Sequence, residues 1–247
     1  MRSVSVLGCR VDDVDADDAT RRILERAKES DAAHVVTLGT EMVVYAQRDE
    51  RFRAIVNACA LSLCDTVGLL WAARRRGLRL ARRVAGVELI EKLCEGAAQD
   101  GTPIYFLGGS DGVAAAAVER LRERHRAMKI AGSRNGYFDD AQSAQIAGAI
   151  RESGARLLLC GLGSPRQEFW LAAHLRDTGC GAGIGVGGSF DVLSGRVRRA
   201  PPAWRRLGLE WLYRLASEPR RWRRQLALPV FVALVLADAL GIRRARA

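Results

Sequence analysis

The chain has 247 residues, of which 49% are hydrophobic and 27% charged, and its net charge is +11. This length supports a sizeable core and this composition excludes a disordered chain, so we expect one large α/β domain, with or without an appendage. The six cysteines include no C-x-x-C pair and mostly lie in apolar runs, which favours buried free thiols over disulfides. The N-terminus has no apolar signal-peptide segment, so we expect a cytoplasmic protein.

The positive charge is concentrated near the C-terminus. Between residues 196 and 247, thirteen arginines accompany three acidic residues, so this segment carries +10 of the net charge and residues 1–195 carry about +1. We therefore predict an α/β domain over residues 1–195 and a basic, helical, amphipathic appendage over residues 196–247. For the first unit we expect a Rossmann-like, mostly parallel sheet flanked by helices, because short apolar runs alternate with helical patterns.

The N-terminal stretch predicts a strand over residues 3–8 and a helix over residues 18–29. Between them, Asp13, Asp15 and Asp17 form two D-x-D patterns, an arrangement with which metal-dependent sugar transferases hold a divalent ion. No apolar strand leads into these aspartates, and aspartates before a helix commonly cap its free N–H groups. We interpret them as helix caps, so the sequence predicts no metal site.

Two later strands end in polar residues. The apolar run 34–38 contains Thr37 and leads into a helix over residues 42–47, and the run 60–64 leads directly to Asp65. An aspartate at the carboxyl end of a strand can act as a general base once partial burial raises its pKa. The alternative is that Asp65 caps the following helix, and the sequence alone leaves both interpretations open.

A glycine-rich loop follows the next expected strand. An arginine-rich segment (71–83) and a helix (87–99) precede a strand over residues 103–107, which ends at Gly108 and Gly109. Glycines let backbone N–H groups approach closely, so this loop can cradle a nucleotide phosphate. The alternative is an ordinary strand-to-helix turn, which also needs glycines. A helix (113–125), a strand (128–131) and a helix from Asp139 to Ile150 are expected to follow.

An unusually polar junction lies between an apolar run and the helical pattern 169–175. Its sequence, Gly-Leu-Gly-Ser-Pro-Arg-Gln-Glu over residues 161–168, places Gly163 and Ser164 at a helix N-terminus, where free N–H groups suit a phosphate. A capped helix with solvated polar residues is the alternative. Beyond it, glycines alternate at positions 181, 183 and 185, which leaves one strand face bare for a backbone or a ligand.

The appendage contains an apolar run of 15 residues, 226–240, which includes Pro229 and Asp238 and is flanked by arginines. A helix that spans a bilayer needs about 20 apolar residues, so this run is too short to cross. The flanking arginines predict that it lies at an anionic membrane surface. A core helix or an oligomer contact is the alternative, so a homo-oligomer is possible and the oligomeric state is left open.

Several motifs occur in the order found in one family of enzymes. The junction 161–168 resembles the pattern GxGxPkQE, and other segments resemble that family's T-x-N-x-E, D-G, R-V-x-G, G-Y-F, G-V-G-x-x-F-D, R-A-P, L-E-W-L-Y-R and E-P-x-R-x-x-R. From about residue 5 to residue 225, the chain thus resembles the WecG/TagA/CpsF glycosyltransferases. Two positions depart from the pattern, because Gly39 replaces the usual asparagine and Thr66 replaces the glycine after Asp65.

The resemblance implies an inverting glycosyltransferase that takes a sugar from a UDP-sugar donor, the sugar being N-acetylmannosamine, its uronic acid or a hexose. The implied acceptor is a sugar on a polyprenyl diphosphate, used in cell-surface polysaccharide or teichoic acid synthesis. The protein would therefore attach peripherally to the inner face of the cytoplasmic membrane. No metal and no other cofactor is expected, since guanidinium groups can pair with the phosphate oxygens.

The same resemblance assigns roles to individual residues. Asp65 is the expected general base, and Thr37, Gln167 and Glu168 are expected to contact the substrates. Arg83 is a candidate ligand of the diphosphate or the acceptor. The appendage arginines that match the family pattern and are expected to stabilise the UDP leaving group are Arg214, Arg221 and Arg224.

Two other classes of protein are compatible with parts of the sequence. The basic composition is typical of nucleic-acid-binding proteins, but the basic residues accompany an apolar run and no nucleic-acid-binding motif occurs, so we expect no nucleic-acid partner. A catalytically inactive membrane scaffold is the second alternative, raised by Gly39 and Thr66. The presence of Asp65 and Gln167 argues against it.

Overall fold

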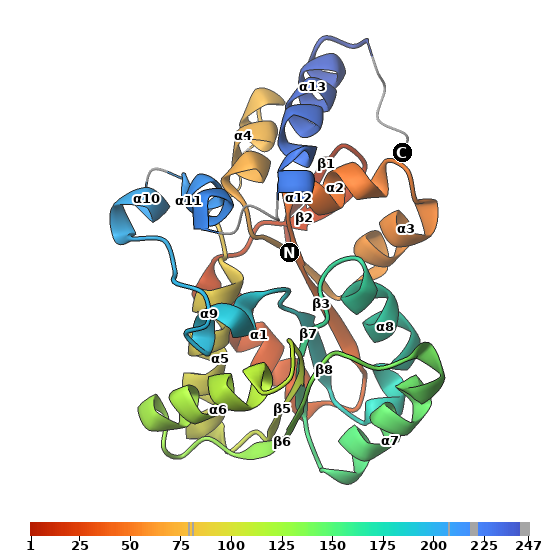
Figure 1. Cartoon of the computed structure of the whole chain (residues 1–247). Coiled ribbons are helices and arrows are strands. Elements are labelled where there is room, and N and C mark those ends of the chain that lie inside the picture. The colour runs from red at the N-terminus through yellow and green to blue at the C-terminus, as the bar shows by residue number, and fades with distance from the viewer. Residues whose placement is uncertain (79, 81, 207, 218–221, 243–247) are drawn as a thin grey trace.

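The computed structural model describes residues 1–78, 80, 82–206, 208–217 and 222–242, and its centre is a six-stranded parallel sheet (Figure 1). The strand order is β4–β3–β8–β7–β5–β6, and every pairing in this sheet is parallel. The strands are β3 (Ala33–Leu38), β4 (Leu61–Cys64), β5 (Ile104–Gly108), β6 (Ile130–Arg134), β7 (Leu157–Gly161) and β8 (Ala182–Gly185). The expected Rossmann-like class is confirmed.

Helices cover both faces of the sheet (Figure 1). The helices on one face are α1 (Ala16–Lys28), α5 (Gly86–Asp100), α6 (Val113–Arg124) and α9 (Ser189–Leu193). The helices on the other face are α2 (Thr40–Ala46), α3 (Glu50–Ala58), α4 (Val67–Arg75), α7 (Ser143–Glu152) and α8 (Arg166–His174). Two short 3-10 helices, Asp140–Gln142 and Arg176–Thr178, accompany α7 and α8.

The core consists of strands that are buried on both faces. In β5, Ile104 and Phe106 pack with α5 and α6, whereas Tyr105 and Leu107 pack with α7 and α8. Alternate residues of a strand point to opposite faces, so a strand covered by helices on both sides needs a continuous apolar run. The apolar runs in the sequence therefore predicted the positions of these strands. All six cysteines lie buried as free thiols.

The N-terminus is a hairpin and not the single strand predicted over residues 3–8. Strands β1 (Ser3–Val6) and β2 (Cys9–Asp12) pair in antiparallel fashion, and β2 packs beside the edge strand β4. The turn residues Leu7 and Gly8 have φ angles of 51° and 82°. Two left-handed residues are what a tight hairpin turn requires, but a leucine at the first position gives no turn signal in the sequence.

The strand predicted over residues 128–131 is displaced along the chain to β6, which spans Ile130–Arg134. This strand forms an edge of the sheet, and its last residues, Ser133 and Arg134, are exposed. An edge strand has one side open to solvent and tolerates polar residues. The apolar pattern therefore ends before the strand does.

Of the D-x-D aspartates, Asp15 and Asp17 lie at the start of α1 as predicted. Asp15 is the N-cap residue, and its Oδ1 accepts hydrogen bonds from the backbone N–H groups of Asp17 at 3.1 Å and Asp18 at 2.9 Å. The Asp17 carboxylate also lies 2.6 Å from Lys92 Nζ. Within the described part of the chain, no group of three or more His, Cys, Asp or Glu side chains could hold a metal ion.

The glycines around β8 leave room for two helices. A Cβ added at Gly183 would lie 2.4 Å from a methyl carbon of Leu175 and 2.9 Å from one of Leu171, both on the α8 side. A Cβ added at Gly181 would lie 2.3–2.7 Å from backbone carbonyl oxygens at the C-terminal end of α1. The bare face of β8 at Gly183 therefore accommodates side chains from the α8 side, and Gly181, which directly precedes β8, accommodates the end of α1.

The C-terminal segment comprises α10 (Pro202–Arg206), α11 (Glu210–Ser217), α12 (Trp222–Gln225) and α13 (Ala227–Ala239). Helix α13 packs against α2 and α4, where Phe231 and Val235 are buried. Its Asp238 carboxylate lies 3.5 Å from Arg76 Nε at the end of α4. Among the described residues, no helix combines the length and the apolarity needed to cross a bilayer.

The close approach at Gly181 predicts a large effect of a single methyl group. Gly181→Ala should lower the free energy of unfolding by about 2–3 kcal/mol, because the backbone carbonyl groups it meets cannot move independently. The control is Gly148→Ala in α7, where an added Cβ meets no atom within 4 Å, and it should raise stability by about 0.5–1 kcal/mol. Urea denaturation measures the free energy of unfolding of each variant. Equal values for Gly181→Ala and Gly148→Ala would contradict this account of the packing.

Candidate active site

A cavity of about 510 Å³ lies at the carboxyl ends of β3, β4, β7 and β8. The loops after these strands form one side, and residues of α11, α12 and α13 form part of the other. Open parallel sheets bind their ligands at this edge. Six of the predicted site residues line the cavity: Thr37, Asp65, Arg83, Gly163, Ser164 and Gln167.

Thr37 and Gln167 are held against the end of the sheet. The Thr37 hydroxyl donates a hydrogen bond to the Gly185 carbonyl at 2.7 Å, and Gln167 Oε1 accepts one from Gly187 N–H at 2.9 Å. A Cβ added at Gly185 would lie 2.6 Å from Gln167 Nε2, so the glycine lets this side chain lie on β8. Both side chains are buried and fixed by these bonds, which suits groups that must orient a ligand.

Glu168 does not line the cavity, although the sequence predicted a substrate contact. It is fully buried, and its Oε1 accepts a hydrogen bond from Gln167 Nε2 at 2.7 Å. Consecutive residues of a helix point about 100° apart, so Gln167 reaches the cavity and Glu168 turns toward the interior. Burial raises the pKa of the Glu168 carboxyl, although hydrogen bonds from Gln167 and Ser164 oppose the shift.

Asp65 lies on the cavity wall at the carboxyl end of β4. Its Oδ1 accepts a hydrogen bond from the backbone N–H of Gly86, the first residue of α5, at 3.1 Å. The N-cap residue of α4 is Thr66, so the alternative in which Asp65 caps the helix that follows it is wrong. The contact with α5 holds the Asp65 carboxylate beside the cavity.

Arg83 is paired with a carboxylate of the C-terminal segment. Its Nη2 lies 2.7 Å from Glu210 Oε2, and the two side chains are 19% and 14% exposed. Burial by itself lowers the pKa of Arg83, but the hydrogen bond to Glu210 and the negative charges of Asp65, Glu210 and Glu88 outweigh it and raise the pKa. The guanidinium therefore remains charged at the cavity, as a phosphate ligand must.

Further ion pairs join the C-terminal segment to α5. Glu88 Oε1 lies 2.6 Å from Arg199 Nη2 and 3.2 Å from Arg205 Nη1. The Glu88 side chain is 47% exposed, and exposed pairs contribute about 0–1 kcal/mol each. The apolar packing of Phe231 and Val235 is therefore the larger contribution that holds this segment on the body.

Gly108 and Gly109 lie outside the cavity lining, although the sequence predicted a phosphate loop there. Gly108 has a φ of 137°, and a Cβ added to it would lie 2.4 Å from the Gly161 backbone. The Gly109 N–H donates a hydrogen bond to the Gly161 carbonyl at 3.1 Å. The close approach of β5 and β7 accounts for Gly108, whereas Gly109 has a φ of 71° and an added Cβ would lie 2.9 Å from Val113 Cγ1. Of the predicted phosphate-loop glycines and serine, Gly163 and Ser164 line the cavity.

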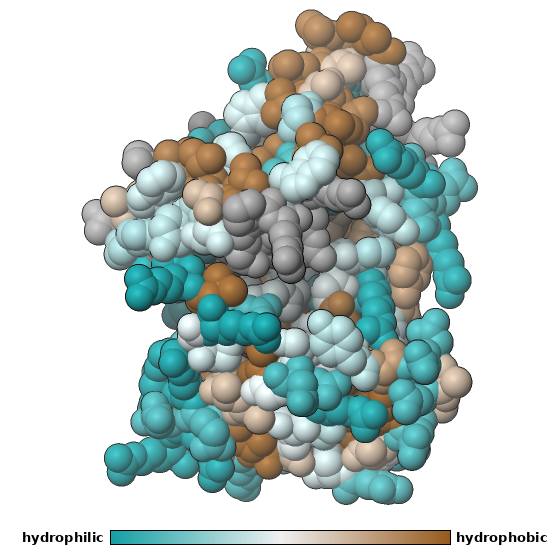
Figure 2. All heavy atoms as spheres, viewed as in Figure 1, coloured by the Kyte–Doolittle hydropathy of each residue, from teal (hydrophilic) through white to brown (hydrophobic). Residues whose placement is uncertain are grey.

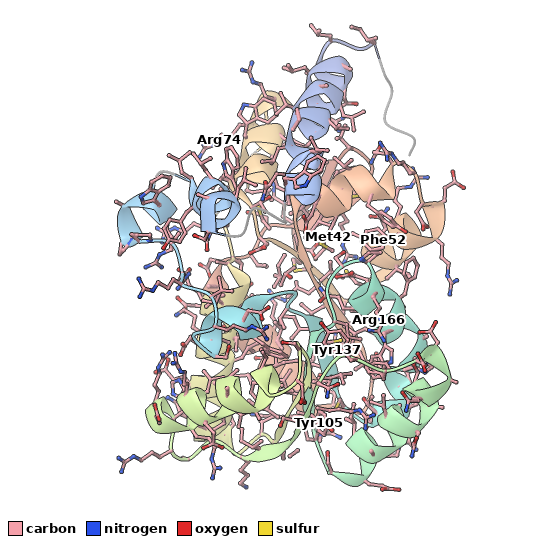
Figure 3. All side chains as sticks on the ribbon, viewed as in Figure 1. Met42, Phe52, Arg74, Tyr105, Tyr137 and Arg166 are labelled. Carbon is pink, nitrogen blue, oxygen red and sulfur yellow. The ribbon has the colours of Figure 1, made fainter. Side chains whose placement is uncertain are left out.

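Arg166 supports the junction 161–168 from outside the cavity lining. Its Nη1 and Nη2 donate hydrogen bonds to the carbonyl groups of Gly136 at 2.7 Å and Phe138 at 2.6 Å. Its guanidinium also lies 4.4 Å from the centroid of the Phe138 ring. Figure 3 shows Arg166 beside Tyr137, so this arginine ties the loop after β6 to the start of α8.

The predicted arginine ligands of the C-terminal segment cannot be placed at the cavity. Arg221 lies outside the described residues, and so do the side chains of Arg214 and Arg224. Their role at a diphosphate stays a prediction.

The sequence interpretation missed most of the apolar side of the cavity. Its members come from α4, α11 and α13: Val67, Trp71, Trp211, Leu228, Phe231 and Val232. The apolar run 226–240 was the available signal, but the expectation of a membrane-facing helix did not include a face directed at the cavity.

The two residues that depart from the family pattern lie next to each other at the cavity. A Cβ added at Gly39 would lie 3.6 Å from Thr66 Cγ2.

These residues are of the types that a displacement with a phosphate leaving group requires. A carboxylate stands at the end of β4, fixed polar groups stand on β3 and α8, and a charged guanidinium precedes α5. A carboxylate can accept a proton from a nucleophile, and a guanidinium stabilises a departing phosphate.

Comparison with known proteins identifies the family of this chain. The sequence pattern of the family described as "Glycosyl transferase WecG/TagA/CpsF family" matches residues 4–245. A relative from Bacillus spizizenii is 34% identical over 204 residues, which cover 83% of this chain and 79% of the relative. That protein is named N-acetylglucosaminyldiphosphoundecaprenol N-acetyl-beta-D-mannosaminyltransferase.

The buried Glu168 predicts a specific pH dependence of stability. Its pKa is raised above the ordinary 4.5, so its contribution to stability is full below pH 4.5 and declines as the pH rises through the raised pKa. Glu168→Gln cannot ionise and keeps an acceptor for Gln167. The stability of the variant relative to the wild type should therefore increase from pH 4 upward, as measured by urea denaturation at several pH values. A constant difference would contradict a raised pKa.

Proposed function

Because the chain belongs to the WecG/TagA/CpsF glycosyltransferase family, we propose that it is an inverting transferase that moves N-acetylmannosamine or a related sugar from UDP to a sugar on a polyprenyl diphosphate. The position of Asp65 carries this proposal, because its carboxylate shares one cavity with Thr37, Gln167 and the charged Arg83. The name of the Bacillus spizizenii relative supports the acceptor and the N-acetylmannosaminyl group.

Asp65 acts as the general base of a single displacement. It accepts the proton of the acceptor hydroxyl while the hydroxyl oxygen forms a bond with the anomeric carbon of the donor sugar. The bond between that carbon and the β-phosphate oxygen breaks, and its electron pair leaves with UDP. Attack opposite to the leaving group inverts the anomeric configuration. The contact between Asp65 Oδ1 and Gly86 N–H fixes one oxygen of the base.

Thr37 and Gln167 orient the sugars for this displacement. The Thr37 hydroxyl hydrogen is engaged with the Gly185 carbonyl, so its oxygen is available to accept a hydrogen bond from a sugar hydroxyl. The Gln167 amide bonds to Glu168 and to Gly187 N–H, which leaves one amide hydrogen for a ligand. Correct alignment of the reacting atoms supplies much of the rate in such reactions.

Cationic side chains stabilise the negative charge that develops on UDP. Among the residues that the structure describes, Arg83 is the candidate cation for this role. When a phosphate binds, Arg83 either gives up its ion pair with Glu210 or divides its N–H groups between Glu210 and the phosphate. Arg214, Arg221 and Arg224 complete this set in our proposal. The division into a catalytic domain (1–195) and an appendage (196–247) then has a functional meaning, because both parts contribute residues to one cavity.

We place the free end of α13 at the inner face of the cytoplasmic membrane. Figure 2 shows hydrophobic residues gathered over α13. Leu240 and Ile242, which follow α13, are 73% and 77% exposed, and Arg74 and Arg75 of α4 are exposed as well. Apolar residues beside cations suit an anionic bilayer surface. The lipid-linked acceptor resides in such a bilayer.

Removal of the base tests the proposed chemistry. Asp65→Asn should lower the rate of acceptor-dependent UDP release by about 10²- to 10⁴-fold, because the amide cannot take the proton. The assay uses a panel of UDP-sugars, with and without a short-chain polyprenyl-diphosphate N-acetylglucosamine, in the presence of a chelator. The control is Asp177→Asn, in a short helix outside the cavity lining, and it should retain wild-type activity. Activity of Asp65→Asn at the control level would contradict the assignment.

Vesicle binding tests the membrane contact. The wild type should cosediment with vesicles that contain anionic lipid, and binding should weaken as salt screens the arginines. Replacing both Leu240 and Ile242 by asparagine should reduce binding by about tenfold or more, since two exposed apolar side chains are lost. Equal binding of the variant and the wild type would place the contact elsewhere.

A further inference from the structure

We propose that the apolar side of the cavity is a subsite for the first isoprene units of the acceptor's lipid chain. This inference rests on the proposed function and extends it, because it assigns a position to the lipid. The acceptor would then be recognised by its chain as well as by its sugar and diphosphate.

The cavity has two chemically distinct sides. The side at the strand ends consists of glycine-rich loops and polar groups, among them Thr37, Asp65 and Gln167. The opposite side consists mostly of aliphatic and aromatic residues, with Glu210 and Gln225 as polar neighbours: Val67, Trp71, Trp211, Leu228, Phe231 and Val232. A sugar nucleotide presents many hydroxyl and phosphate groups, and aliphatic side chains cannot satisfy these groups by hydrogen bonding. An isoprene chain matches that side.

The order of groups along the cavity matches the order of groups in the acceptor. Asp65 marks the position of the reacting sugar hydroxyl, and Arg83 stands between the loop that carries Asp65 and the C-terminal segment. The acceptor carries a sugar, then a diphosphate, then the lipid. With the sugar at Asp65 and the diphosphate at Arg83, the first carbons of the lipid meet residues that flank Glu210, such as Trp211.

Buried side chains hold the apolar side of the cavity in place. Phe231 and Val235 are only 1% and 3% exposed, and they fix α13 between α2 and α4. A Cβ added at Gly68 would lie 3.6 Å from the Phe231 ring, so the ring packs directly on the α4 backbone. Helix α13 therefore presents its cavity-facing residues in fixed positions.

The apolar side also continues to the molecular surface. Val67, Trp211 and Val232 line the cavity and are nonetheless 38%, 38% and 41% exposed. A chain lying on them can therefore leave the cavity at the molecular surface. The undecaprenyl chain of such an acceptor is far longer than the cavity, so an exit of this kind is necessary.

Two single variants of α13 test the subsite, Val232→Asn and the control Leu236→Asn. Val232 and Leu236 of α13 are 41% and 40% exposed, but only Val232 lines the cavity. KM is measured for N-acetylglucosaminyl diphosphates that carry one or three isoprene units, with saturating UDP-N-acetylmannosamine and without detergent or vesicles. For the wild type, the longer chain should lower the acceptor KM by about tenfold or more, because each buried methylene contributes.

Val232→Asn should remove most of this preference for the longer chain and leave the KM for the UDP-sugar unchanged. Leu236→Asn should keep the wild-type preference. The proposal is overturned if chain length does not change the acceptor KM of the wild type, or if both variants lose the preference equally. It is also overturned if Val232→Asn raises the KM for the UDP-sugar, because the apolar side would then hold the nucleotide. If the wild type releases UDP from no donor with either acceptor, the proposed function itself fails, which is a separate result. Thermal unfolding of both variants verifies that they are folded.

Discussion

The arrangement of the site depends on the absence of side chains along one face of β8. Gly183 and Gly185 let α8 approach the strand so closely that a single added methyl group would overlap Leu175 or Gln167. Neighbouring side chains cannot move aside to accept such a methyl group, because protein interiors are packed as tightly as organic crystals. The position of α8 therefore sets the position of Gln167, and through it the polar end of the cavity.

A chain of hydrogen bonds transmits this constraint. Glu168 orients the Gln167 amide, the amide oxygen receives the N–H of Gly187, and Thr37 is tied to the carbonyl of Gly185. Residues from β3, β8 and α8 are thus fixed relative to one another before any ligand arrives. Preorganised polar groups of this kind need little rearrangement during a reaction. The appendage is attached differently, mainly by apolar packing of α13 and by partly exposed ion pairs.

The sequence predicted the sheet and much of the polar side of the cavity, because both depend on local patterns. Buried strands require apolar runs, and Asp65 directly follows one of them. The hairpin turn at Leu7 escaped prediction because its conformation is imposed by the pairing of β1 with β2 and leaves no mark in the residue type. Glu168 was misplaced because a motif does not say which of two neighbouring side chains faces inward. The apolar side was missed because it forms only when segments distant in sequence pack together.

The buried cysteines have a practical consequence for labelling the protein. Burial raises the pKa of Cys9, Cys59, Cys64 and Cys94 to about 12 and that of Cys180 to about 11, and it raises the pKa of Cys160 as well. Since the thiolate is the reactive form, these thiols react slowly with maleimides while the chain is folded. One cysteine placed on the exposed face of α13 would therefore carry a fluorophore selectively, with all six native cysteines retained.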